Sequence, residues 1–174
     1  MDVQVIIVGA GPTGLMLACE LGLAGVRPTL LEREPRPNPV PKANGLVGHI
    51  VRVFQARGLF DGAPDLLPVT PTRFPFGPIS LELDRLTDNP LRVLMISQHR
   101  LETLLTARAT ELGATIRRGN EVVGIDVAPD GMDVRVRTEA GTGELTAEYI
   151  VGCDRARSFV RRQRWHRLPR NHQR

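Results

Sequence analysis

A chain of 174 residues with 41% hydrophobic content is long enough for one domain with a real hydrophobic core. The formal net charge of +4 comes from one end, since residues 155–174 hold eight arginines and no acid, and removing those eight leaves 15 basic against 19 acidic residues. No window offers the ~18 consecutive apolar residues of a membrane span, and the chain runs directly into a strand, so we expect neither a membrane protein nor a secretory signal. Cys19 and Cys153 form no C-x-x-C pair, which favours a reducing cytoplasm.

Residues 3–32 have the pattern of a nucleotide-binding βαβ unit. The apolar run at residues 5–8 predicts a buried parallel strand. A helical pattern then continues to about Gly25, and a second short apolar run ends on Glu32. Between the first strand and the helix, three glycines have the spacing G-x-G-x-x-G: Gly9, Gly11 and Gly14. Because all these parts fall in register, a nucleotide site is favoured over an ordinary glycine turn.

Each part of this pattern has a physical role. Gly9 permits the tight turn out of the strand, Gly11 lets the backbone approach a pyrophosphate, and Gly14 lets the helix pack closely. The helix N-terminus offers free N–H groups and the positive end of its dipole to phosphates. Glu32 lies 18 residues after Gly14, where a carboxylate accepts hydrogen bonds from ribose hydroxyls and repels a 2′-phosphate. The site therefore suits FAD or NAD better than NADP.

The elements expected after Glu32 alternate between helices and short strands. A proline-rich loop comes first, and helices are then expected at residues 46–56 and 101–112, the second with Ser97 as N-cap and Gly113 as its end. Residues 63–78 contain five prolines and are expected to be irregular. The expected strands are residues 79–83, 91–96, 114–117, 120–128, 132–138 and 144–152.

The last three of these strands set the fold class. Residues 120–128 and 132–138 predict a hairpin around Pro129-Asp130-Gly131, and the end of the last strand is apolar enough to return to the parallel sheet. The prediction is an α/β, Rossmann-like domain with a parallel sheet and an antiparallel β excursion. Such an excursion is absent from the simple alternation of NAD dehydrogenases.

Together these motifs resemble the N-terminal part of the FAD-dependent aromatic hydroxylases, flavoprotein monooxygenases similar to p-hydroxybenzoate hydroxylase and the polyketide hydroxylases. The resemblance covers residues 3 to about 163. It rests on residues 9–15 with 32–33, 42–45, 97–105 and 154–161.

The resemblance implies FAD as cofactor, NADPH or NADH as reductant, and oxygen-dependent hydroxylation of a small aromatic or phenolic substrate. It places Glu32 on the adenosine ribose, Gln98 near the ribityl–pyrophosphate region, the Lys42 segment beside the flavin and the backbone at Val122 against adenine. Asp154 begins a second motif that approaches the pyrophosphate and is linked to NADPH. The expected cofactor-binding residues are Gly9, Gly11, Pro12, Thr13, Gly14, Glu32, Arg33, Lys42, Gln98, Val122 and Asp154.

The flavin carries the chemistry in this family, so no catalytic side chain is expected, and the four histidines show no metal-ligand spacing. Two positions depart from the family pattern. Lys42 replaces an arginine and loses its bidentate fork. Arg155 replaces the glycine expected after Asp154, so a positive φ or a close backbone approach there would strain the turn or obstruct the ligand. This departure weakens the pyridine-nucleotide role of the motif.

The chain is expected to be truncated. Residues 1–160 are predicted to form a partial FAD-binding domain without the substrate half, and residues 161–174 a basic, disordered tail. That tail does not resemble the family's continuation, so we expect an out-of-frame end. A nucleic-acid arm is disfavoured, because Trp165 is the only aromatic there that could stack on a base.

Three functions remain open from the sequence. The chain is part of an FAD-dependent aromatic hydroxylase that retains at most FAD binding, or an NAD-binding oxidoreductase or sensor domain, or an inactive remnant. Its partners are expected to include neither nucleic acid nor membrane, and its oligomeric state is open. The substrate is not specified by these residues.

Overall fold

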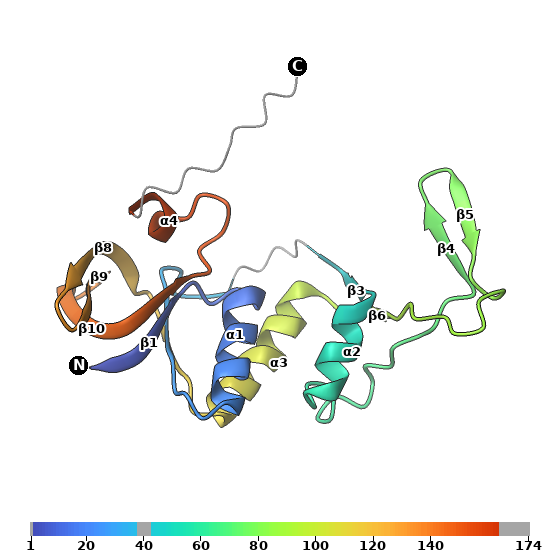
Figure 1. The fold of residues 1–174 in the computed structure, drawn as a ribbon, viewed down its shortest axis with the longest axis horizontal. Helices are drawn as coiled ribbons and strands as arrows, with labels where there is room; N and C mark the ends of the chain where they lie inside the picture. The colour runs from blue at the N-terminus through green and yellow to red at the C-terminus, as the bar shows by residue number, and fades with distance from the viewer. Residues whose placement is uncertain (1, 38–42, 164–174) are drawn as a thin grey trace, which may run out of the picture. The chain divides into compact units, whose positions relative to one another are not determined.

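The structure, a computed structural model, describes residues 2–37 and 43–163 (Figure 1). The described residues form two units, one of residues 2–37 with 105–163 and the other of residues 43–104. The boundary between the units falls inside one helix, α3 (Gln98–Glu111). Each unit has its own sheet structure and is described separately.

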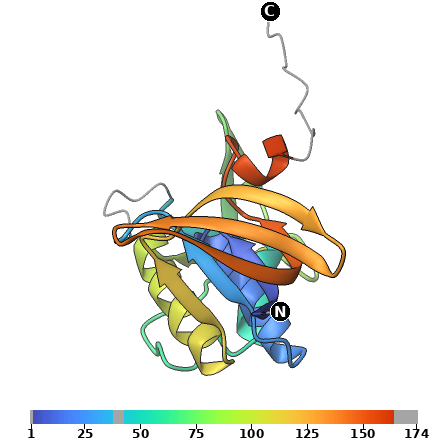
Figure 2. The same ribbon diagram turned by 90° about the vertical axis from the view of Figure 1, so that its left-hand side faces the viewer.

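A six-stranded sheet organises the first unit, with the strand order β7-β2-β1-β10-β9-β8 (Figure 2). Its strands are β1 (Val3–Val8), β2 (Thr29–Glu32), β7 (Thr115–Arg118), β8 (Glu121–Ala128), β9 (Gly131–Thr138) and β10 (Gly141–Gly152). β1 pairs in parallel with β2 and with β10, and β2 pairs in parallel with β7. β9 pairs antiparallel with both β8 and β10. The predicted α/β class, the hairpin and the return of the last strand to the parallel sheet are all confirmed.

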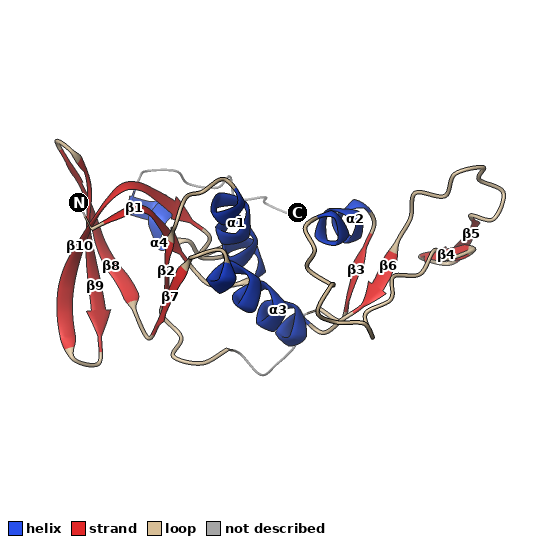
Figure 3. Ribbon diagram, turned by 90° about the horizontal axis from the view of Figure 1, so that it is seen from below, coloured by secondary structure: helices blue, strands red, loops and turns tan. Residues whose placement is uncertain are grey.

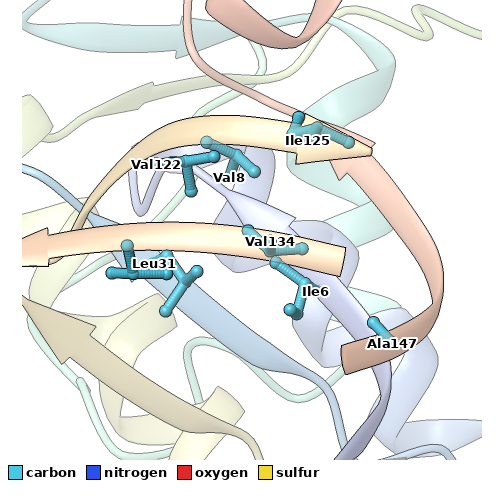
Figure 4. Close-up of a cluster of buried hydrophobic side chains, with 8 residues drawn as sticks. Ile6, Val8, Leu31, Val122, Ile125, Val134 and Ala147 are labelled. Atoms are coloured by element: carbon cyan, nitrogen blue, oxygen red, sulfur yellow. The ribbon is translucent and has the colours of Figure 1, made fainter. Parts of the chain in front are cut away.

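The core of this unit lies between the parallel strands and the β8–β9 hairpin. Ile6 and Val8 on β1 and Leu31 on β2 pack with Val122 and Val134 from the hairpin strands (Figure 4). These side chains alternate along β1 with Val5 and Ile7, which are also buried and point to the other face. β1 is therefore covered on both faces, as its uninterrupted apolar sequence predicted.

The first helix of the chain and residues 105–111 of α3 lie on the face of the parallel strands opposite the hairpin (Figures 1 and 2). α1 (Pro12–Leu23) buries Leu15, Ala18 and Cys19. The Cys19 thiol lies 3.7 Å from the Leu105 carbonyl oxygen of α3. Small residues on α1 thus allow close packing, as expected from the sequence.

The second unit contains two separate two-stranded sheets (Figure 3). β3 (Gly45–Val47) pairs antiparallel with β6 (Val93–Met95), and β4 (Arg73–Phe76) pairs antiparallel with β5 (Ile79–Glu82). α2 (His49–Ala56) follows β3.

Two sequence predictions in the second unit were wrong. The helix predicted from residue 46 begins only at His49, because Leu46 pairs with Leu94 and Gly48 breaks the backbone at a φ of 87°. Residues 73–76 were predicted to be irregular but form β4. Pro75 is tolerated there because a two-stranded hairpin leaves an edge that needs no N–H donor.

The ends of α3 are as predicted. Ser97 Oγ accepts a hydrogen bond from the Arg100 N–H at 3.3 Å, which confirms the N-cap. Gly113 follows the helix with a φ of 90°. The helix begins at Gln98, three residues before its first predicted leucine.

A short helix that the sequence did not predict, α4 (Phe159–Gln163), follows β10. It includes the first three residues of the predicted tail, and the remainder of that tail lies outside the described residues. Across residues 2–37 and 43–163, no helix is long and apolar enough to cross a membrane.

Candidate functional site

Three backbone segments meet where β1 ends. Gly9 has a φ of 106°, and its N–H donates to the Leu31 carbonyl at 2.8 Å. A Cβ added to Gly9 would lie 2.6 Å from the Cys153 carbonyl oxygen, and one added to Gly14 would lie 2.0 Å from the Gly9 carbonyl oxygen. The fold itself therefore requires both glycines, which confirms the predicted turn and close packing.

Gly11 differs from its two neighbours in the motif. A Cβ added there would meet no atom within 4 Å, and its φ of −80° is open to any residue. The protein's own packing thus gives no reason for glycine at this position. The open space fits the predicted approach of a ligand to the backbone.

The first turn of α1 presents unused hydrogen-bond donors beside this space. The first helical bond runs from the Leu15 N–H to the Gly11 carbonyl at 3.0 Å, and no side chain caps the helix. The N–H groups of Gly11, Thr13 and Gly14 donate to no other described residue, and Pro12 has no N–H to offer. Free donors at a helix N-terminus, with the dipole's positive end, suit an anion such as a phosphate.

Glu32 is tied to the same turn. Its Oε2 accepts the Ala10 N–H at 2.9 Å, and its Oε1 accepts the Glu34 N–H at 3.0 Å. A carboxylate oxygen has two lone pairs, so each keeps capacity for a further donor such as a ribose hydroxyl. Arg33 pairs with Glu34 at 3.3 Å on the surface, and its role in cofactor binding stays a prediction.

The Asp154 segment borders the glycine turn from β10. The Cys153 N–H donates to the Val8 carbonyl at 2.8 Å, and the Asp154 Cα would lie 3.3 Å from a Cβ on Gly9. Asp154 Oδ2 accepts the N–H groups of Phe159 and Val160, and so caps α4, while its Oδ1 is buried without a partner among the described residues. Its carboxylate therefore shapes the loop whether or not it also meets a cofactor.

Arg155, directly after Asp154, has a φ of 71° and is the only non-glycine residue with positive φ in the described part of the chain. The concern raised by the sequence, that this position requires a glycine-like backbone, is correct. The arginine accepts that conformation rather than changing the turn.

No described contact joins the other predicted site residues to the glycine turn. Gln98 lies in the second unit, where its backbone N–H donates to the Ala43 carbonyl at 3.0 Å and its Nε2 donates to Glu102 at 2.7 Å. Val122 lies in β8 beside a β-bulge and packs in the core with Val8. Lys42 lies outside the described residues. Their cofactor contacts stay predictions.

Sequence reasoning did not single out Ala10 or Cys153 as parts of the site. Ala10 links the turn to Glu32, and Cys153 packs against Gly9 and Gly14. Burial, and secondarily the neighbouring Asp154, raises the pKa of the Cys153 thiol, which disfavours the reactive thiolate. In the sequence, the only sign that Cys153 belongs to the site is its position directly before Asp154. Within the described ranges, no cluster of histidine, cysteine or acidic residues could hold a metal ion.

The family is decided by comparison with known sequences. Residues 2–172 match the FAD binding domain family. The chain belongs to that family. The matched range reaches residue 172, so it includes most of the segment that we expected to depart from the family.

The relatives of this FAD-binding chain include named monooxygenases. It is 40% identical over 163 residues to a 12-dehydrotetracycline 5-monooxygenase/anhydrotetracycline 6-monooxygenase of Streptomyces rimosus, covering 93% of this chain and 32% of that protein. An aromatic hydroxylase from angucycline biosynthesis is similar in structure, with a TM-score of 0.87 and 34% identity over 95% of this chain and 33% of that chain. An aklavinone-11 hydroxylase solved with FAD and aklavinone has a TM-score of 0.76 and 29% identity over 92% and 34% of the two chains. The chain thus spans about a third of these relatives, which confirms the predicted resemblance to an N-terminal part.

Proposed function

We propose that this chain is the FAD-binding part of a flavoprotein monooxygenase that hydroxylates an aromatic or phenolic substrate with NADPH or NADH and oxygen. The observation that carries the proposal is the group of free donors at Gly11, Thr13 and Gly14, which lie beside open space and close to the Glu32 carboxylate. Family membership and the names of the relatives support the same reading. A cytoplasmic location stays a prediction.

The residues of the site fit the adenosine diphosphate portion of FAD. The N–H groups of α1 would hold the diphosphate, and Glu32 would hold the ribose through its remaining lone pairs. FAD, when bound, supplies the redox chemistry of the reaction. The protein's described residues would bind and orient it.

The substrate class rests on the relatives alone. Their names concern anhydrotetracycline, angucycline biosynthesis and aklavinone. We therefore expect the complete enzyme to act on an aromatic compound. The isolated 174-residue chain is expected to bind FAD without hydroxylating such a substrate, since it spans only a third of the proteins that do so.

A direct test is titration of the purified chain with FAD and, separately, with NAD, followed by flavin fluorescence and thermal unfolding. We expect saturable FAD binding, little response to NAD, and weaker FAD binding by Glu32→Ala, which removes both ribose acceptors. Preference for NAD would support an NAD-binding oxidoreductase or sensor, because Glu32 can accept hydrogen bonds from the adenosine ribose of either FAD or NAD. Binding of neither ligand by a folded chain would identify an inactive remnant.

A further inference from the structure

Arg155 occupies a place beside the glycine turn where the family pattern has no side chain. It directly follows Asp154, whose Cα would lie 3.3 Å from a Cβ on Gly9. Gly9 in turn is packed against the first turn of α1 through Gly14. The start of the Arg155 side chain is thus one residue away from the backbone that borders the free N–H donors.

The position of Arg155 is fixed from both sides. Before it, the Cys153 N–H donates to the Val8 carbonyl within the sheet. After it, the N–H groups of Phe159 and Val160 are held by Oδ2 of the preceding Asp154. Holding a non-glycine residue at a φ of 71° strains the backbone. A glycine would avoid that strain, so the turn gives no structural reason for an arginine.

The Arg155 side chain also has no partner within the described part of the chain. It is exposed, and no ion pair or hydrogen bond joins it to a described residue. Arg161 in α4, by contrast, donates to the Ala156 carbonyl. An unpaired guanidinium on the loop that borders the glycine turn would add a full positive charge to a site whose other donors are neutral, while Glu32 contributes a negative charge.

We propose that Arg155 is a binding residue for the diphosphate of FAD and supplies a charge-assisted contact in place of the close backbone approach that glycine would allow. The proposal rests on the proposed function, since it concerns the same site. A guanidinium group binds two phosphate oxygens at once through bidentate hydrogen bonds, and these charge-assisted bonds are about twice as strong as hydrogen bonds between neutral groups. The arginine thereby neutralises part of the negative charge of the diphosphate, which the uncharged N–H groups and the negative Glu32 cannot do.

The test compares Arg155→Gln, Arg155→Lys and Arg155→Gly with the wild-type chain in titrations with FAD, ADP and adenosine. The matched control is Arg85→Gln, which removes an exposed arginine of the second unit that lies outside residues 154–161. We expect Arg155→Gln to weaken FAD and ADP binding about tenfold and to leave adenosine binding unchanged, because adenosine lacks the diphosphate. Arg155→Lys should retain part of the affinity, and Arg85→Gln all of it. The salt dependence of ADP binding should be shallower in Arg155→Gln than in wild type.

Arg155→Gly separates binding from backbone strain. We expect it to raise the unfolding temperature, because glycine accepts the positive φ, and yet to weaken FAD binding. If Arg155→Gln binds FAD as Arg85→Gln does, or if Arg155→Gly binds FAD more tightly than wild type, this inference is overturned while the FAD site stands. If the folded wild-type chain binds neither FAD nor ADP, the proposed function fails and the role of Arg155 fails with it.

Discussion

The two glycines Gly11 and Gly14 should respond in opposite ways to the same substitution. An alanine at Gly14 would place a Cβ 2.0 Å from the Gly9 carbonyl oxygen, an overlap with backbone that no rotamer can relieve. An alanine at Gly11 would meet no atom within 4 Å. The first change should therefore damage the fold, and the second should affect the ligand.

The magnitudes follow from the local geometry. Alanine inside a helix is favoured over glycine by about 1 kcal/mol, but overpacking against fixed backbone costs about 1–3 kcal/mol and here exceeds that range because of the short contact. We expect Gly14→Ala to lower the free energy of unfolding by at least about 2 kcal/mol, which in a chain of this size lowers the unfolding temperature by roughly 4–8 °C. Gly11→Ala loses only a helix-capping preference of about 0.5–1 kcal/mol.

Binding separates the two variants further. A methyl group at Gly11 would occupy the space beside the free N–H donors, so we expect FAD affinity to fall at least tenfold, which corresponds to about 1.4 kcal/mol. Thermal and urea unfolding followed by circular dichroism measure stability, and quenching of flavin fluorescence measures affinity. Wild-type stability in Gly14→Ala would refute the packing argument, and wild-type FAD affinity in Gly11→Ala would refute the placement of the diphosphate.

Three further predictions concern groups around the site. Burial raises the pKa of Cys19 to about 11, so the folded state keeps the thiol proton to a higher pH than the unfolded state does. The free energy of unfolding should therefore fall as the pH rises from about 9 to 11, by at most about 1.4 kcal/mol per pH unit. Urea unfolding at several pH values should show a smaller fall in Cys19→Ala. Asp154→Ala removes the acceptor of two N–H groups of α4 and should lower the free energy of unfolding, measured with urea, by about 1–3 kcal/mol. A decrease below about 0.5 kcal/mol would show that the loop keeps its structure without this cap. Beyond Ala147, no described strand pairs with β10 on the edge away from β1, and the Tyr149 side chain is 63% exposed. We therefore expect the chain to self-associate in light scattering and Tyr149→Thr to reduce this association; a monodisperse wild type would contradict it.

The first unit was predictable because its signals are local or strongly periodic. The run at residues 5–8 is apolar throughout because helices cover one face of β1 and the β8–β9 hairpin covers the other. Gly131 marks the hairpin turn with a φ of 150°. Each of these patterns is readable within about ten residues.

The second unit was less predictable because its strands are short and their partners distant. β3 is only three residues long and is defined by pairing with β6, more than forty residues later. Over three residues, apolar content alone does not distinguish a strand from the start of a helix. α4 was not predicted because it is only five residues long and has too few residues for a helical pattern. Its N-terminal N–H groups are instead held by Asp154 and Ser158 of the preceding loop.

The site combines residues that are constrained for different reasons, and the structure separates those reasons. Gly9 and Gly14 are needed by the fold, whereas Gly11 is needed only if something outside the described protein atoms approaches the backbone. Arg155 shows the reverse case, because the fold would accept glycine more easily and the chain nevertheless has an arginine. Local rules that a sequence breaks without a structural gain tend to concentrate at functional positions. Both the unexplained glycine and the unexplained arginine border the same free N–H donors, so the simplest common cause is an anion bound between them.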